Sequence, residues 1–111
     1  MGRSFGVFMG NDDRDKLVRL RSRLAREGMV DAVPVAQAVR HAVAFAIREP
    51  VDAAALKMAA SLDAYAEAMR IKLSEVDRKN IGKLRKRIRG ESDGHTLRYA
   101  ILVASRRKVK S

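Results

Sequence analysis

Phe5-Gly-Val-Phe-Met9 and Met69-Arg-Ile-Lys-Leu73 are two five-residue stretches that lie 64 positions apart and follow the same pattern. In each stretch every second residue is large and apolar, so that one side of an extended chain is apolar and the other side is free to differ. A repeat of two predicts a β-strand with one buried face. A strand this short needs a partner for its backbone N–H and C=O groups. We therefore expect the two stretches to pair with each other.

The similarity continues downstream of each stretch at the same separation. An Asp-Arg pair comes first in both copies, Asp13-Arg14 and Asp77-Arg78, and apolar residues spaced by three and four positions follow. This spacing predicts an amphipathic helix in each copy. Two helices rich in Arg and Leu can also look alike by chance, and that alternative stays open from the sequence alone. The matched apolar residues are Leu17, Leu20 and Leu24 in the first copy and Ile81, Leu84 and Ile88 in the second.

A second pair of segments matches at a separation of 58 positions, Val39–Arg48 with Leu97–Arg106. The change in separation is a six-residue shortening of the loop between the matched blocks, and loops are where insertions are tolerated. The apolar residues of the first segment cover more than one stripe, and Leu97 to Ala104 of the second is almost wholly apolar, so we expect two buried helices. The first is expected to begin near Pro34, a residue suited to the first turn of a helix.

The repeat divides the chain into two units within a single domain. We expect a first unit over residues 1–49, a helical connector over 50–67, a second unit over 68–105 and a basic tail over 106–111. The connector is rich in Ala, and one side of it carries Val51, Ala55, Met58, Ala59, Leu62 and Tyr65. The fold class expected is mainly α with one short two-stranded antiparallel β-ribbon, in which the two units form an intramolecular pseudo-dimer.

The net charge of the chain favours a polyanion as its partner. The 111 residues carry 24 Lys and Arg against 13 Asp and Glu, a net charge of +11. Most of the excess lies in residues 66–111, which hold 14 basic and 5 acidic side chains. Neutralising phosphates releases condensed counterions, so such a charge is typical of proteins that bind nucleic acid. A charged, solvated surface without a nucleic-acid partner is the plainer interpretation.

Composition also limits the cellular setting that we expect. The chain has no Cys, which excludes disulfides and thiolate metal sites. No apolar run approaches the roughly 18 residues that span a bilayer, and the first residues lack the features of a signal peptide. We expect a cytoplasmic protein that acts without a membrane and without a cofactor.

The order strand, basic amphipathic helix, loop and buried helix resembles the ribbon-helix-helix family of DNA-binding proteins, to which the methionine and Arc repressors belong. Because both halves lie in one chain, the sequence is similar to tandem members of the family, among them accessory proteins of plasmid conjugation and T-DNA transfer. The resemblance implies a bacterial, DNA-associated protein that inserts its ribbon into the major groove. It implies an accessory role in DNA transfer or transcription regulation, with relaxosome-type DNA-processing proteins as further partners. A monomer is expected.

The resemblance, together with the strand phase, predicts which residues contact bases. Arg70 and Lys72 fall on the outward side of the second strand, and both can donate to guanine O6 and N7. In the first strand Ser4 can hydrogen-bond a base, and Arg3 can reach the groove edge or a phosphate. Phe8 can contact a thymine methyl group, or it can belong to the core if the strand phase is broken locally. Because the two strands differ, the two half-sites are expected to differ as well.

The resemblance also implies that the start of each buried helix contacts the DNA backbone, where exposed amides bind phosphate. For His95 an exposed residue without a function is the alternative. The charge run along the first helix of the second unit is interpreted mainly as its solvated face. The basic tail is expected to add non-specific attraction. The predicted phosphate contacts are Val35 in the first unit, Ser92, Gly94, His95 and Thr96 in the second, and Arg106, Arg107 and Lys108 in the tail.

The sequence shows no pattern that indicates an enzyme. His41 falls within a buried helix and matches Tyr99, so a packing role is expected for both. No cluster of His, Asp and Glu has the spacing of metal ligands, and no glycine-rich loop precedes a helix in the manner of a phosphate cradle. The alternative function is that of an RNA-binding or ribosome-associated basic helical protein. The few aromatic residues argue against it, because modules that read RNA sequence usually expose aromatic side chains.

Overall fold

The two predicted strands pair with each other, although they lie more than sixty residues apart. The computed structural model describes residues 3–61 and 66–106, with side chains from Phe5 onward. Strands β1 (Arg3–Met9) and β2 (Glu67–Leu73) form a two-stranded antiparallel sheet. Gly6 lies opposite Arg70 at the middle of the register. Each strand is two residues longer than the apolar alternation alone predicts, because pairing continues to Arg3 and to Glu67.

Each strand leads directly into an amphipathic helix. Helix α1 (Asn11–Glu27) follows β1, and helix α4 (Glu75–Ile88) follows β2. Matched carboxylates close both helix starts: Asp13 accepts a hydrogen bond from the Gly10 amide at 2.9 Å, and Asp77 accepts one from the Ser74 amide at 3.0 Å. A carboxylate at this position satisfies an amide at the helix start and suits the helix dipole. The predicted apolar residues Leu17, Leu20, Ile81, Leu84 and Ile88 are buried.

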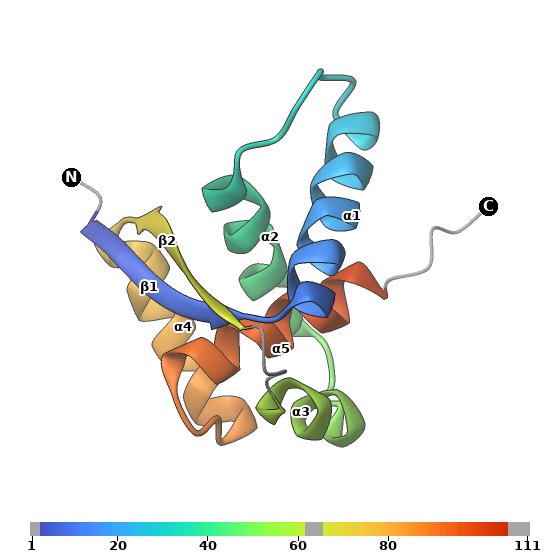
Figure 1. The fold of residues 1–111 in the computed structure, drawn as a ribbon. Coiled ribbons are helices and arrows are strands. Elements are labelled where there is room, and N and C mark those ends of the chain that lie inside the picture. Colours follow the sequence, from blue (N-terminus) through green and yellow to red (C-terminus); the bar gives the residue numbers. More distant parts are fainter. Residues whose placement is uncertain (1–2, 62–65, 107–111) are drawn as a thin grey trace.

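Two further helices supply the centre of the core. Helix α5 (Asp93–Ser105) is buried over nearly its whole length, as the sequence predicts. Helix α2 (Val35–Arg48) was expected to be buried as well, but it buries only one side. Helix α5 contacts every other helix as well as β1. Figure 1 shows α5 at the middle of the molecule, with the other helices and the ribbon around it. The buried α5 residues are His95, Thr96, Leu97, Arg98, Tyr99, Ala100, Ile101, Leu102 and Ala104.

The connector differs from the prediction of one helix over residues 50–67. Helix α3 spans only Ala53–Ala60, with Asp52 as its cap, and Glu67 already belongs to β2. The connector ends early because Glu67 and Ala68 extend to pair with Met9 and Phe8. Of the predicted apolar side, Ala55 and Ala59 are buried, but Val51 and Met58 are substantially exposed. Leu62 and Tyr65 lie outside the described residues.

The two halves exchange contacts across the molecule. Helix α1 packs on α5 and helix α4 packs on α2, while β1 contacts α5 and β2 contacts α2. Arg40 of α2 makes a two-pronged ion pair with Asp77 of α4, at 2.8 and 2.9 Å. No helix within the described part of the chain is long and apolar enough to cross a membrane.

Candidate nucleic-acid interface

The ribbon has one covered face and one open face. Val7, Met9, Ile71 and Leu73 point inward and are buried against the helices. The residues between them point outward and are exposed, and in Figure 1 the ribbon passes in front of α4. A two-stranded ribbon with an uncovered face is one of the few protein elements that fit the major groove of DNA. The described outward residues are Gly6, Phe8, Ala68, Arg70 and Lys72.

Three of the predicted base-contacting residues, Arg70, Lys72 and Phe8, lie on this open face. Arg70 lies opposite Gly6, and Lys72 lies opposite Ser4, so both cations project from the same side of the ribbon. Both side chains are exposed. The backbone of Ser4 and of Arg3 belongs to β1, but their side chains lie outside the described residues.

Phe8 resolves the alternative that the sequence left open. Its side chain is 57% exposed, while its neighbours Val7 and Met9 are buried. The strand phase is therefore unbroken, and Phe8 belongs to the outer face rather than to the core.

A buried arginine holds this part of the ribbon in place. Arg98 donates from Nη1 to the Phe8 carbonyl at 3.1 Å and from Nε to the Ala59 carbonyl at 3.0 Å. Burial lowers the pKa of Arg98, and the nearby carboxylates of Asp13 and Glu91 oppose that effect. An arginine stays charged in a protein, so these are charge-assisted hydrogen bonds. They tie the end of β1 to α5 and to α3.

The start of α5 corrects two of the predicted phosphate contacts. His95 is 3% exposed: its Nδ1 accepts from the Glu91 amide at 3.0 Å, and its Nε2 donates to the Leu56 carbonyl at 2.8 Å. Thr96 is 0% exposed, and its hydroxyl donates to the Ser92 carbonyl at 2.8 Å. The predicted contacts were made by backbone amides, and both amides are used within the fold: the His95 amide donates to the Ser92 hydroxyl and the Thr96 amide to the Ser92 carbonyl, each at 3.0 Å. The buried side chains cannot reach a phosphate either. The alternative of an exposed His95 without a function is also wrong.

The remaining predicted phosphate contacts are placed unevenly. Ser92 is exposed and caps α5, with its hydroxyl accepting from the His95 amide at 3.0 Å. Gly94 is half-buried, and a side chain there would meet Val7, which places the start of α5 beneath β1. Val35 begins α2 and is half-buried. Arg106 is exposed and donates to Met58 Sδ at 3.2 Å. Arg107 and Lys108 lie outside the described residues.

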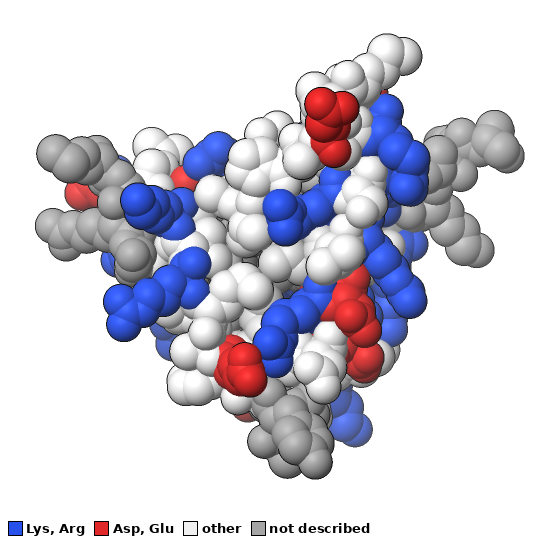
Figure 2. All heavy atoms as spheres, turned by 45° about the horizontal axis from the view of Figure 1, so that its top comes forward, with Lys and Arg blue, Asp and Glu red and all other residues white. Residues whose placement is uncertain are grey.

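Two arginines beside the ribbon were recognised in the repeat but not as part of an interface. Arg14 makes an ion pair with Glu67 at 3.2 Å, at one end of the ribbon. Arg78 lies over the Phe5 ring, 5.7 Å from its centroid. They occupy matched positions at the starts of α1 and α4, so the doubled Asp-Arg pair was the signal that could have located them. In Figure 2 basic side chains are spread over the face shown, with neutral and acidic residues between them.

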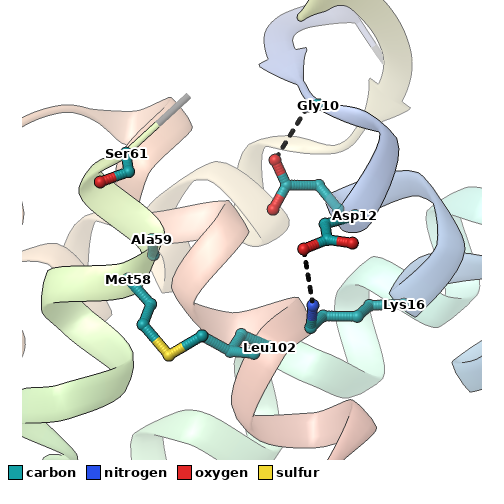
Figure 3. Close-up of a pocket in the computed structure, with 8 residues that line it drawn as sticks. Gly10, Asp12, Lys16, Met58, Ala59, Ser61 and Leu102 are labelled. Atoms are coloured by element: carbon teal, nitrogen blue, oxygen red, sulfur yellow. Dashed lines mark hydrogen bonds and ion pairs between the residues drawn. The ribbon is translucent and has the colours of Figure 1, made fainter. Parts of the chain in front are cut away.

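An open pocket of about 280 Å³ lies where α1, α3 and α5 meet. Figure 3 shows its charged groups already paired: Lys16 lies 3.9 Å from the Asp12 carboxylate, and Asp13 accepts from the Gly10 amide. Met58 and Leu102 supply an apolar wall. Among the described residues no group of three or more His, Asp or Glu side chains could hold a metal ion. The pocket thus offers no group of converging reactive side chains.

Comparisons of the chain with protein-family models, with curated proteins and with solved structures found no match. What the ribbon can bind follows from its own chemistry: an uncovered strand pair, two hydrogen-bond-donating cations and one exposed aromatic ring.

Proposed function

We propose that this chain binds double-stranded DNA by laying the outer face of the β1–β2 ribbon in the major groove. The observation that carries the proposal is the joint exposure of Arg70 and Lys72 on a ribbon face that no helix covers. Both side chains carry donors for guanine O6 and N7, which line that groove. The net charge of +11 supplies the sequence-independent attraction to phosphates.

We further propose that the two halves act as an intramolecular pseudo-dimer of ribbon-helix-helix units. The exchanged packing supports this: α1 on α5 is matched by α4 on α2, and β1 on α5 is matched by β2 on α2. The charged residues support it as well. Arg40 pairs with Asp77, and their repeat partners Arg98 and Asp13 are also close enough to interact electrostatically. A single chain with this arrangement needs no second copy to complete its ribbon.

Backbone amides at the helix starts are the proposed phosphate contacts that remain. At α5 the His95 and Thr96 amides are used by the Ser92 cap, which leaves those of Asp93 and Gly94. Gly94 lies against Val7, so these amides stand next to the ribbon. Amides at a helix start bind anions without any particular side chain. The start of α2 at Val35 takes the same role in the first half.

For the biological role we propose an accessory factor in DNA transfer or a regulator of transcription. The difference between the two strands on the outer face favours the accessory role, because regulators built from identical halves usually meet palindromic operators. That part rests on the family resemblance.

Binding of the Arg70→Ala/Lys72→Ala variant to duplex DNA tests the proposal. Loss of two base contacts should weaken binding to the preferred duplex by about 100-fold or more, while binding to random duplex falls far less. Fluorescence anisotropy across a salt series, with duplexes selected from a random pool, measures both. The matched control is Arg26→Ala/Lys86→Ala, which removes the same charge near the ends of α1 and α4 that lie away from the ribbon.

Three results would contradict the proposal. If both variants lose the same affinity for every duplex, Arg70 and Lys72 contribute only through their positive charge and not through base contacts. Tighter binding of single-stranded RNA than of any duplex DNA would favour the RNA-binding alternative. Failure of the unaltered protein to bind any duplex would reject DNA binding altogether.

A further inference from the structure

The outer face of the ribbon changes character from one end to the other. Three outward positions of β2 lie opposite β1: Lys72 opposite Ser4, Arg70 opposite Gly6, and Ala68 opposite Phe8. Lys72 places a cation at one end, and Phe8 and Ala68 place only apolar side chains at the other. A ribbon made of two identical strands would carry the same groups at both ends. Here the two strands carry different outward residues, so the two ends of the ribbon differ.

The middle pair strengthens the asymmetry. Gly6 and Arg70 occupy the centre of the register, where two equivalent strands would place two equal side chains side by side. Apart from Gly6 itself and its two chain neighbours, no atom of the described residues lies within 4 Å of the position that a Gly6 Cβ would take, so a side chain would fit there. One central arginine can form its two-donor contact with only one guanine at a time. The half of the duplex that Arg70 contacts is thus distinguished from the other half.

The apolar end is held firmly enough to make a specific contact. Phe8 is 57% exposed, but its backbone carbonyl is fixed by Arg98 at 3.1 Å, and Arg98 itself is buried. The ring therefore projects from an anchored strand. Phenylalanine in the major groove contacts the 5-methyl group of thymine, the one apolar group that base edges present there.

We infer that the ribbon reads an asymmetric duplex, in which Arg70 and Lys72 contact guanines in one half and Phe8 packs against a thymine methyl group at the opposite end. The inference rests on the proposed function. It adds which base each end of the ribbon contacts, and it implies that the protein binds its DNA site in only one orientation.

Replacing thymine with deoxyuridine tests the Phe8 contact without changing base pairing. A duplex is first selected from a random pool with the unaltered protein. Its thymines at the end opposite the guanines are then replaced, which removes only methyl groups. The unaltered protein should lose about fourfold in affinity for each methyl group contacted. Phe8→Ala should bind both duplexes equally. A selected sequence without thymine at that end, or an equal loss for Phe8→Ala, would overturn the inference.

A symmetrised ribbon provides a second and independent test. Gly6→Arg/Phe8→Lys gives β1 the side chains that β2 carries at the matched positions 70 and 72, and circular dichroism reports whether the variant folds. Selection with the folded variant should yield a palindromic, guanine-containing sequence in place of the asymmetric one. An unchanged asymmetric sequence would overturn the inference. If the variant does not fold, the deoxyuridine comparison decides.

The outcomes separate this inference from the proposed function. A palindromic sequence selected by the unaltered protein would reject the asymmetric reading and leave DNA binding intact. No binding to any duplex would reject the proposed function, and the asymmetric reading with it.

Discussion

Two glycines in the second half show how differently one residue type can be constrained. Gly90 lies against the buried hydroxyl of Thr96, and an added Cβ would overlap it. Gly82 lies within α4, and apart from its chain neighbours and the backbone of its own helix an added Cβ there would meet no described atom within 4 Å. The close approach at Gly90 keeps the α4–α5 loop short, so that Ser92 can cap α5.

Alanine at each of these glycines should have opposite effects on stability. Gly90→Ala forces Thr96 or the loop to move and should lower the free energy of unfolding by about 1–3 kcal/mol. Gly82→Ala replaces a flexible residue inside a helix and should raise it by about 0.5–1 kcal/mol. Urea denaturation of both variants measures the difference. An unchanged free energy of unfolding for Gly90→Ala would show that the loop can move to accommodate the added methyl group.

At the level of elements, the sequence predicts what is local and misses what depends on distant pairing. The alternation of apolar residues at every second position predicted both strands, and the spacing of Leu17, Leu20 and Leu24 predicted α1. The alternation could not show that pairing with Phe8 and Met9 extends β2 back to Glu67, which shortens the connector.

The same limit explains the errors in the candidate site. Arg70 and Lys72 were assigned to the outer face from alternation alone, and the structure places them there. For Phe8 the sequence left both the outer face and the core open, and the structure shows it exposed. His95 and Thr96 were expected at the surface because they begin a helix. They are buried because Leu56 of α3 supplies a carbonyl to His95 and the α4–α5 loop closes over Thr96. Nothing local in the sequence signals either contact.

The packing of α3 against α5 depends on the hydrogen bonds of Arg98, and the variant Arg98→Lys tests that dependence. Lysine keeps the charge but cannot hold the Ala59 and Phe8 carbonyls together with one planar group. We expect a loss of about 1–3 kcal/mol in stability and faster amide hydrogen exchange in α3 and at the Phe8 end of β1.

The matched control is Arg40→Lys, which alters the corresponding residue of the first half. Arg40 pairs with Asp77, whereas the Ala59 carbonyl accepts from Arg98. Replacement of Arg40 should leave hydrogen exchange in α3 unchanged. Equal acceleration of α3 in both variants would mean that general destabilisation, and not the lost hydrogen bonds, loosens the helix.

For the whole molecule, the Arg40–Asp77 pair is a charged link between the two halves. The Arg40 guanidinium lowers the pKa of Asp77 from 3.8 to about 2, and burial of the carboxyl works in the opposite direction. Because the pKa is depressed in the folded state, the pair contributes its full stability above about pH 4. That contribution is lost as the pH falls through about 2.

Comparison with Arg40→Ala across pH isolates this contribution. The Arg40 side chain is 52% exposed, so the variant should be less stable by only about 1–2 kcal/mol above pH 5. The difference from the unaltered protein should shrink towards zero near pH 2. Urea denaturation of both proteins between pH 2 and pH 7 measures this difference in the free energy of unfolding. A difference that is independent of pH would assign the effect to packing of the Arg40 side chain instead.

Methylation protection of duplex DNA by dimethyl sulfate is the most direct test of major-groove binding by the ribbon. The reagent modifies guanine N7, the atom that Arg70 and Lys72 are proposed to contact in that groove. We expect the unaltered protein to protect guanine N7 at a selected site, and Arg70→Ala/Lys72→Ala to lose that protection at concentrations where it still binds. Bound protein that leaves guanine N7 fully reactive, or that shields only the minor-groove edge of adenine, would contradict the account.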